Sequence, residues 1–438
     1  MVSHSAADTA PATSNGRNLQ PVNENSLEDS STHLVQQADS GKSYVDRNFQ
    51  FSTKVVTSPT ALEEYSKVLM QLARCASEPN VFYEPWMLLP ALRAFGQNDS
   101  FAFVLIFGQR TGVSPLLCGF VPFLITNRYR GIPLRAARLW SYQHFYWSAP
   151  LIRAGYERPC LDCLFEWLQS KDSPCSWIEF SSMPAEGLLA RALVDAVNEL
   201  GLPRYISELY TRAVLRRDFD ADSCIRKALP GRRLKELGRV RRRLAEKGAL
   251  TLEELTPERD ISEWIEGFLA LEGMGWKGRA GTALASTPEK RQFFTASAKA
   301  AFASGQLMML RLCLDRRAIA YKCNFLSPPA SFAFKIAYDE QYASYSPGVH
   351  LELENIRRFH ATTGLEWMDS CAVADHFMAN HLWSESLSIQ STAVVVGGRL
   401  NGLLLSMLPL LKWAKNSATR TRQPRTQDNE VKEAKDQV

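Results

Sequence analysis

The sequence lacks any apolar run long enough to span a membrane. Its strongest apolar stretch, Leu403 to Leu411, falls far short of the ~20 residues that a spanning helix needs. Residues 1–43 are rich in Ser, Asn, Asp and Gln and lack the apolar core of a secretory signal peptide. We therefore expect a soluble, cytoplasmic protein.

A regular cysteine framework is also missing. The chain has nine cysteines, an odd number, and Cys160 and Cys163 form a lone Cys-x-x-Cys pair. A zinc site would need a second such pair or suitably spaced histidines. His376 and His381 lie five residues apart without an accompanying carboxylate motif. We expect no metal, and free thiols that suit a reducing, cytoplasmic compartment.

Neither sign of charge dominates, because 51 Lys and Arg against 46 Asp and Glu leave a net charge of +5. This mild excess permits a phosphate-bearing cofactor without requiring nucleic acid. Basic residues gather between 226 and 247, where Leu234, Leu237, Val240 and Leu244 recur at helical spacing. The pattern predicts a helix with a basic face that is solvated, or that contacts an anionic cofactor or a membrane surface. The segment lacks interleaved aromatic residues, which favours nucleic acid least.

The composition is that of a folded protein, with 45% hydrophobic and 10% aromatic residues among 438. This length favours two domains with tails. We expect a disordered leader (1–45), an N-terminal domain (46–210), a C-terminal domain that holds the chemistry (211–397), and an apolar segment with a basic, polar tail (398–438). The apolar part of that tail either docks on the body or makes peripheral contact with a membrane.

The two halves share one predicted order of elements, with helices first, then antiparallel strands, a helix and a further strand. This order predicts an α/β fold with mixed, mostly antiparallel sheets flanked by helices, and it suggests an internal duplication. In the first half we expect helices at 61–76, 161–169 and 187–200 and strands at 101–107, 116–125 and 176–180. In the second we expect helices at 261–271, 287–304 and 349–363 and strands at 307–314, 318–325, 331–338 and 365–371.

Three stretches carry a resemblance to a known family. They are residues 80–86 (NVFYEPW) with 119–123 (GFVPF), residues 271–284 (LEGMGWKGRAGTAL), and residues 335–342 (KIAYDEQY) with 346–349 (SPGV). Through them the chain resembles the acetyltransferase (GNAT) superfamily, and within it the cellulose-biosynthesis acetyltransferase-like group of the CelD/BcsL type. The resemblance implies tandem acetyltransferase-like domains, as in the Fem peptidyltransferases, with an acyl-CoA or aminoacyl donor.

A strand–loop–helix junction, residues 344–349, stands where many acetyltransferases carry a Gln/Arg-x-x-Gly-x-Gly/Ala loop that holds the CoA pyrophosphate. Here it reads Ser-Tyr-Ser-Pro-Gly-Val, which departs from that pattern. A helix start still offers unpaired N–H groups to an anion, and a glycine permits close approach. An ordinary turn uses the same residues. Given the resemblance, we expect the cofactor to bind at Ser346, Pro347, Gly348 and Val349.

Acyl transfer from a thioester needs a base, donors for the oxyanion and an acid for the leaving thiolate. In the fold that the chain resembles, the strand at 331–338 supplies backbone N–H to the thioester carbonyl. Asp339 ends this strand and is one candidate base, and Asp369 on the next strand is the other. Tyr338 or Tyr342 is the candidate acid. Each of these residues also has a structural reading, as a turn cap or as a packed phenol.

Aromatic, cationic and glycine residues cluster in the loop Gly275–Arg279. Trp276 can stack on an acceptor or cofactor ring, and Lys277 and Arg279 can grip a phosphate or carboxylate. Lys335 and Trp367, on the strands next to the candidate bases, complete the expected substrate-binding set. The alternative is a glycine-hinged loop with solvated charges.

These expectations point to an acyl-CoA-dependent N- or O-acyltransferase acting on a small molecule or saccharide, in polysaccharide or envelope biosynthesis. One alternative is a Fem-like ligase that uses aminoacyl-tRNA as donor. The other is a degenerate acetyltransferase fold that serves as a binding module without catalysis.

Overall fold

The computed structural model describes residues 49–374, 377–398, 402 and 405. The expected leader, His376 and most of the C-terminal apolar segment lie outside this part of the chain. Among the residues that it covers, no helix is both long enough and apolar enough to cross a membrane.

The first half of the described chain alternates helices with antiparallel strands. Its elements are β1 (Gln50–Val56), α2 (Pro59–Glu63), α3 (Ser66–Ala73), η2 (Val81–Tyr83), α4 (Pro85–Phe95), β2 (Ser100–Gln109), β3 (Leu116–Thr126), β4 (Ala136–Leu139), β5 (Leu151–Ile152), α5 (Glu157–Gln169), β6 (Trp177–Pro184), α6 (Leu188–Glu199) and β7 (Arg204–Arg216). The helix expected at 61–76 is thus two helices, broken near Tyr65.

The second half repeats this order after two added helices. Its elements are α7 (Ala221–Ala228), α8 (Gly231–Ala245), β8 (Leu250–Glu254), α9 (Ile261–Met274), α10 (Trp276–Arg279), α11 (Pro288–Ala303), β9 (Leu307–Leu314), β10 (Arg317–Ser327), β11 (Ala330–Tyr338), η3 (Glu340–Tyr345), α12 (Pro347–Ala361), β12 (Trp367–Asp369), α13 (Phe377–Leu382) and β13 (Glu385–Val395). The Thr287 side chain accepts the Lys290 N–H at the start of α11, and Pro288 fills its first turn.

One sheet runs through both halves, in the order β1-β2-β3-β4-β6-β13-β7-β12-β11-β10-β9-β8. In each half, antiparallel strands end in one parallel pair, β4 with β6 and β11 with β12. The shared order supports an internal duplication. The predicted fold class is confirmed: mixed α/β, with a mostly antiparallel sheet flanked by helices.

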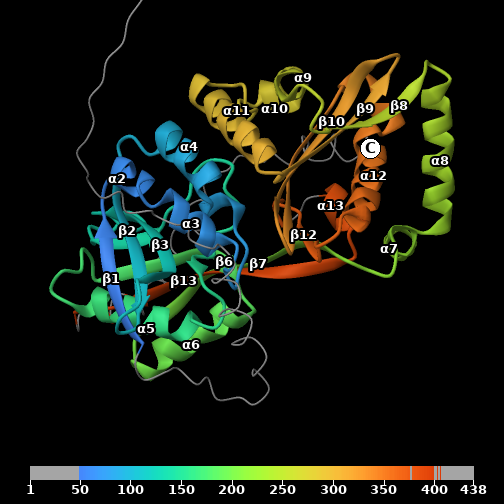
Figure 1. Ribbon diagram of the computed structural model, residues 1–438. Coiled ribbons are helices and arrows are strands. Elements are labelled where there is room, and N and C mark those ends of the chain that lie inside the picture. The colour runs from blue at the N-terminus through green and yellow to red at the C-terminus, as the bar shows by residue number, and fades with distance from the viewer. Residues whose placement is uncertain (1–48, 375–376, 399–401, 403–404, 406–438) are drawn as a thin grey trace, which may run out of the picture. The chain divides into compact units, whose positions relative to one another are not determined.

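The long strands β7 and β13, which the sequence analysis did not anticipate, join the two groups of strands (Figure 1). β7 pairs with β13 from Arg204 to Val214 and with β12 from Val214 to Arg216. β13 in turn pairs with β6 of the first half. Each group of strands is therefore extended by a strand from the other half of the chain, β13 beside β6 and β7 beside β12.

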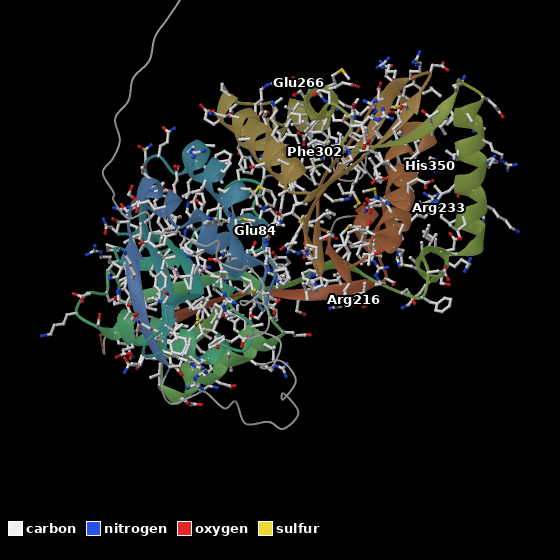
Figure 2. All side chains as sticks on the ribbon, in the orientation of Figure 1. Glu84, Arg216, Arg233, Glu266, Phe302 and His350 are labelled. Carbon is white, nitrogen blue, oxygen red and sulfur yellow. The ribbon has the colours of Figure 1, made fainter. Side chains whose placement is uncertain are left out.

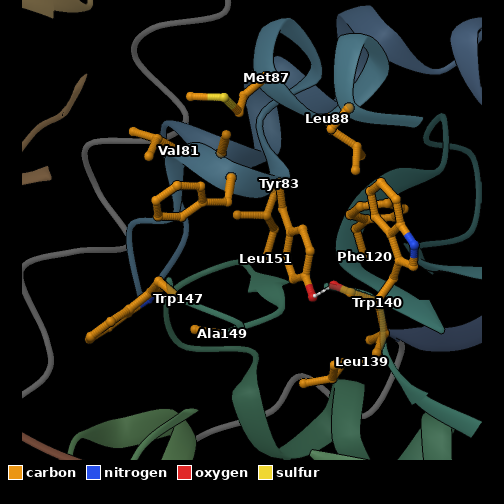
Figure 3. Packing of buried hydrophobic residues seen from close by; sticks show 14 of the residues in the cluster. Val81, Tyr83, Met87, Leu88, Phe120, Leu139, Trp140, Trp147, Ala149 and Leu151 are labelled. Carbon is orange, nitrogen blue, oxygen red and sulfur yellow. Dashed lines mark hydrogen bonds between the residues drawn. The ribbon is translucent and has the colours of Figure 1, made fainter. Parts of the chain in front are cut away.

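Aromatic side chains form a core that both halves share. In the first half, the Tyr83 hydroxyl donates to the Trp140 carbonyl at 2.8 Å within packed apolar residues (Figure 3). The segment that follows β4 carries Trp147 onto Trp367 of β12, with ring centroids 5.5 Å apart. Tyr142 of the same segment meets Phe293 of α11. First-half residues thus form part of the surroundings of β11 and β12.

A buried ion pair fixes β12 to β7. Arg212 and Asp369 lie 2.9 Å apart with side-chain exposures of 2% and 0%. The guanidinium also stands over the Trp147 ring, 5.6 Å from its centroid. Asp369 further accepts the Cys371 N–H at 2.7 Å. The pair therefore holds three segments together at the end of β12.

We predict that Asp369→Ala lowers the free energy of unfolding by about 3–5 kcal/mol, because it leaves Arg212 buried without a counter-charge. The matched control is Glu385→Ala, which breaks the exposed Arg216–Glu385 pair (51% and 42% exposed) and should cost at most ~1 kcal/mol. Urea unfolding followed by tryptophan fluorescence measures both changes. Equal losses for the two variants would contradict a structural role for Asp369.

Candidate functional site

A pocket of about 820 Å³ lies at the end of β11. Its walls come from α7 and α8, from the α9–α10 junction, from η3 and the start of α12, and from α13. Seven of the residues predicted from the sequence line it: Trp276, Lys277, Tyr338, Ser346, Pro347, Gly348 and Val349. The structure thus brings the two predicted loops to one cavity.

The open edge of β11 forms one wall. β12 pairs with β11 at Ala330 to Phe332, whereas β11 continues to Tyr338. A shift in the β10–β11 register between Cys323 and Phe325 marks an irregularity of the bulge type at this point. Beyond it, the Ile336 carbonyl accepts a hydrogen bond from Lys277 Nζ at 2.6 Å. This part of the edge offers backbone groups to whatever enters the pocket.

The N-terminus of α12 forms a second wall. Ser346 has a left-handed conformation (φ 49°), Pro347 occupies the first turn, and the Ser346 side chain does not cap the helix. The first N–H groups of a helix have no carbonyl partner within it. A Cβ added to Gly348 would lie 3.3 Å from the Tyr338 ring, so a larger residue would crowd this wall. The arrangement suits an anion, as the sequence predicts for this junction.

A buried network attaches α12 to the sheet. Lys322 of β10 pairs with Glu352 of α12 at 2.8 Å, and both side chains are buried. The other Glu352 oxygen accepts from Asn355 at 2.8 Å and from Trp383 at 3.2 Å. Asn324 donates to Asn355 at 2.7 Å. These contacts fix the helix whose start lines the pocket.

Glu272, which the sequence analysis assigned no role, lies at the inner end of the pocket with its side chain fully buried. One oxygen accepts the Leu284 N–H at 2.7 Å. The other lies 3.3 Å from Lys335 Nζ and 3.9 Å from Lys277 Nζ. Three ionisable groups, from α9, α10 and β11, therefore meet here.

The two lysines of this cluster are perturbed. Burial, reinforced by the nearby Lys335 charge, lowers the pKa of Lys277 to about 8, although Glu272 opposes the shift. Burial also lowers the pKa of Lys335. At neutral pH Lys277 is thus a protonated amine that loses its proton more readily than an ordinary lysine, which suits proton transfer.

A pattern in the sequence could have revealed Glu272. The buried face of α9 comprises Trp264, Ile265, Phe268 and Leu269, and Glu272 is four residues beyond Phe268 on that face. A carboxylate on an apolar helix stripe is expensive to bury without partners. The stripe itself was visible in the sequence, but its lysine partners depend on the fold.

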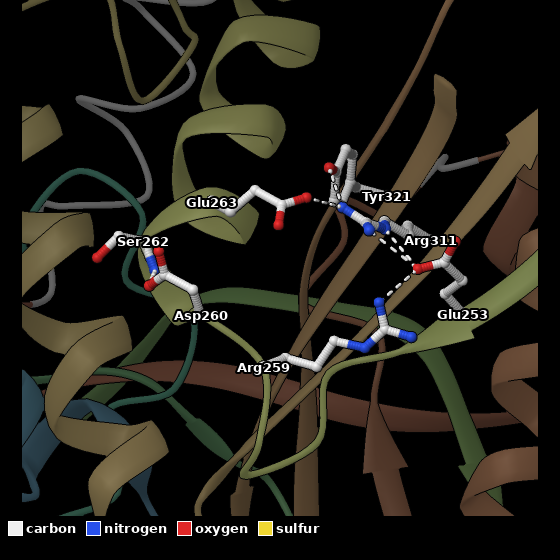
Figure 4. Close-up of polar contacts among 7 residues, drawn as sticks. All are labelled: Glu253, Arg259, Asp260, Ser262, Glu263, Arg311 and Tyr321. Carbon is white, nitrogen blue, oxygen red and sulfur yellow. Dashed lines mark hydrogen bonds and ion pairs between the residues drawn. The ribbon is translucent and has the colours of Figure 1, made fainter. Parts of the chain in front are cut away.

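The start of α9 is tied to the sheet by an arginine cluster. Arg311 of β9 pairs with Glu263 at 2.7 Å and with Glu253 at 2.9 Å (Figure 4). Arg259 reaches the same Glu253 at 2.9 Å. Because Arg311 anchors the first turn of α9, it helps to position Glu272 at the other end of that helix.

The segment Gly275–Arg279, expected to be a loop, forms the short helix α10 from Trp276 to Arg279 and closes the rim of the pocket. Trp276 is 54% exposed, and its backbone N–H donates to Glu340 at 2.6 Å. Arg279 pairs with the other Glu340 oxygen at 2.8 Å and is absent from the lining. A Cβ on Gly278 would lie 1.8 Å from the Gly273 carbonyl, so this turn requires glycine. The segment is therefore held in place, with Lys277 directed into the pocket.

Of the other predicted residues, Lys335 and Arg279 lie outside the lining, as do Asp339, Asp369 and Trp367. Asp339 caps η3 by accepting the Gln341 N–H at 3.0 Å, and it pairs with Arg317 at 2.8 Å. Asp369 is engaged with Arg212, and Trp367 packs against Trp147. Tyr338 does line the pocket, and burial raises the pKa of its phenol.

Comparison with known families identifies the second half. Residues 231–377 match the family model of the acetyltransferase (GNAT) domain. This segment is therefore similar to GNAT-type acetyltransferase domains. It contains the α9–α10 loop, β11 and α12, and therefore most of the pocket. No curated protein matches the sequence.

Several solved structures are similar to the chain at low identity. FemX is 10% identical with a TM-score of 0.49, and the match covers 77% of this chain and 96% of that one. L-PGS from Bacillus licheniformis is 10% identical with a TM-score of 0.40, covering 79% and 95%. A tandem GNAT protein from the clavulanic acid biosynthesis pathway is 11% identical with a TM-score of 0.37, covering 80% and 99%.

The first half differs from the GNAT domain at the equivalent helix start. α5 follows β4 and β5 as α12 follows β11, but its first residue is Glu157, which is buried and accepts the Gly155 N–H at 3.2 Å. A carboxylate thus already occupies the position where the start of α12 would receive an anion. Within the described residues, no group of His, Cys, Asp and Glu could hold a metal ion.

We predict that the amine of Lys277 reacts with an amine-selective acylating reagent with a pH midpoint of about 8. Lys335→Met should raise the midpoint by removing a neighbouring positive charge, and Glu272→Gln should lower it by removing a negative one. Mass spectrometry of the peptide that contains Lys277 follows the reaction. A wild-type midpoint near 10.5, or no movement in either variant, would contradict the proposed cluster.

Proposed function

We propose that the protein is an acyl-CoA-dependent N- or O-acyltransferase whose reaction takes place in the pocket at the end of β11. The observation that carries the proposal is the meeting of three features in this cavity: the open β11 edge, the start of α12 and the buried Glu272–Lys277–Lys335 cluster. An anion-binding end and an ionisable end within one pocket suit a donor with a phosphate group and a reactive thioester. An acyl-CoA donor also favours a cytoplasmic reaction.

The donor would bind along the wall formed by β11 and α12. The N–H groups at the start of α12, around Gly348 and Val349, would receive the pyrophosphate. The pantetheine arm would follow the edge from Ile336 to Tyr338, with Lys277 giving up its bond to the Ile336 carbonyl. The pocket volume of about 820 Å³ is within the usual range for cofactor sites, ~300–1,000 Å³.

The chemistry would be direct transfer. The acceptor amine or hydroxyl attacks the thioester carbonyl, the new C–N or C–O bond forms, and the C–S bond breaks. Glu272 is the proposed base for the acceptor proton, because it is the carboxylate at the inner end of the pocket. Lys277, still protonated at neutral pH, or Tyr338 would protonate the departing thiolate. Asp339 and Asp369 would keep the structural roles that their partners indicate.

The finer assignment rests on the resemblance stated above. Two of its stretches, residues 271–284 and 335–349, contribute to the walls of the pocket. We therefore propose a CelD/BcsL-type enzyme with a small-molecule or saccharide acceptor, in polysaccharide or envelope biosynthesis.

A second candidate is an aminoacyl-tRNA-dependent ligase, which α8 favours. Arg232, Lys235, Arg239 and Arg242 recur along one exposed side of this helix, opposite the buried Leu237 and Leu244. Figure 2 shows nitrogen-tipped side chains reaching outward from α8, next to the pocket that Arg233 lines. Such a stripe would suit a polyanion. The lack of interleaved aromatic residues favours the acyl-CoA reading.

We predict that acetyl-CoA or a longer acyl-CoA raises the melting temperature of the wild-type protein, corresponding to about 2.7 kcal/mol at a hundredfold excess over Kd. Gly348→Glu should abolish the shift by placing bulk and negative charge at the start of α12. The matched control is Gly238→Glu, on the open surface of α8, which should keep it. Stabilisation by aminoacyl-tRNA and by no CoA would support the ligase. Binding of CoA without turnover would support a non-catalytic module.

Once an acceptor is identified, Glu272→Gln should lower kcat by about 10²–10⁴-fold, because the proton acceptor is lost, while the Kd for acyl-CoA stays within a few-fold, because the start of α12 is unchanged. Asp339→Asn is the matched comparison and should stay within a few-fold of wild type. Stopped assays of free thiol release measure both. The reverse ranking would make Asp339 the base.

A further inference from the structure

The inner end of the pocket holds more positive than negative charge. Lys277, Lys335 and Lys290 of α11 are all largely buried. Within the described part of the chain, Glu272 is the one carboxylate that pairs with Lys277 and Lys335, and Lys290 pairs with none. Lys290 Nζ instead donates to the Gly281 carbonyl at 3.0 Å and to Ser286 at 2.9 Å. Among these three lysines, two share the Glu272 carboxylate and the third has no carboxylate partner.

Such an excess is costly in a site sheltered from water. A buried charge without a partner is among the most expensive features a fold can contain. The groups around the cluster respond accordingly, since the pKa of Lys277 falls to about 8 and that of Lys335 falls as well. A bound anion would relieve the same excess.

The first half of the chain contributes a further group. His144, in the segment between β4 and β5, is buried with a left-handed backbone (φ 76°), and its ring faces Phe334 of β11. Its Nε2 is buried and has no hydrogen-bond partner among the described residues. Burial, with the charges of Lys335, Lys290 and Lys277, lowers its pKa to about 3. The ring is therefore neutral at physiological pH and has one polar atom unsatisfied.

We propose that the acceptor substrate carries an anionic group, a carboxylate or a phosphate, which binds at Lys335, Lys290 and His144 beside Glu272. Glu272 and Lys277 line the pocket, and Lys335 lies directly behind them, 3.3 Å from Glu272. Lys290 and His144 lie close enough to Lys335 for their charges to interact. An anion there would bring the net charge of the cluster toward zero, and a neutral His144 with a proton on Nε2 could donate to it. That the anion belongs to the acceptor substrate rests on the proposed function, whereas the anion site itself does not.

This assignment gives the first half of the chain a role in the reaction. The segment that carries His144 also packs Tyr146 against Phe334 and Trp147 against Trp367. The first half would thus select the acceptor, whereas the GNAT domain binds the donor. Neutral sugars would be poor acceptors, and their phosphorylated or carboxylated counterparts good ones.

The test uses sodium phosphate and sodium malonate as probes, with sodium chloride at equal ionic strength as reference. Melting temperatures are measured for the full chain with Gly348→Glu, which blocks the anion position at α12. Phosphate, malonate or both should raise the melting temperature, and adding Lys335→Met should remove most of the rise. Adding Lys247→Met, in the exposed turn after α8, is the matched control and should keep it. A larger response to phosphate indicates a phosphorylated acceptor, and a larger response to malonate a carboxylated one.

No response in the Gly348→Glu protein, or an equal response with and without Lys335→Met, would overturn the proposal. If Lys335→Met fails to fold, Lys290→Met serves instead, because Lys290 is the other lysine of the proposed site, and this variant should lose at least half of the response. The two proposals fail separately. An anion response without acetyl-CoA binding would remove the acyl-CoA donor but keep the anion site, and the opposite result would do the reverse.

Discussion

The site depends on the point where β11 and β12 part. These parallel strands pair over three residues of each, and β11 then runs on without β12. The register irregularity in β11 and the buried Arg212–Asp369 pair lie at this point, one re-aiming β11 and the other holding β12 to β7. Without the separation, the β11 edge would be closed by strand hydrogen bonds. The pocket, the outward-facing carbonyl of Ile336 and the access to Glu272 all follow from it.

The two halves of the chain share an order of elements but contribute different residues to the site. Both halves have a parallel strand pair and a helix between its two strands, yet the helix of the first half starts with a buried Glu157, whereas α12 starts with Ser-Pro-Gly. The first half packs His144, Tyr146 and Trp147 against the strands of the second. In the proposed reaction, one half would bind the donor, and the other would help to enclose the inner, positively charged end. The paired strands β7 and β13 join the two halves in one sheet.

Local patterns revealed the parts of the site that are short in sequence. The Trp276–Lys277 loop and the Ser346–Val349 junction were predictable because their glycines and prolines specify turns that a helix follows. Contacts between distant residues were not predictable. His144 meets β11 across almost two hundred positions, and Glu272 is a surface-type residue whose burial depends on Lys335. The strands β7 and β13 were not predicted, because polar residues interrupt their apolar pattern.

A crystal structure of the protein bound to CoA tests the central claim most directly. The account predicts the pyrophosphate at the backbone N–H groups of Gly348 and Val349, and the pantetheine arm along β11 from Ile336 to Tyr338. It also predicts that the sulfur points toward Lys277 and Glu272. CoA bound in the first half, near α5, or held only by the outer face of α8, would contradict it.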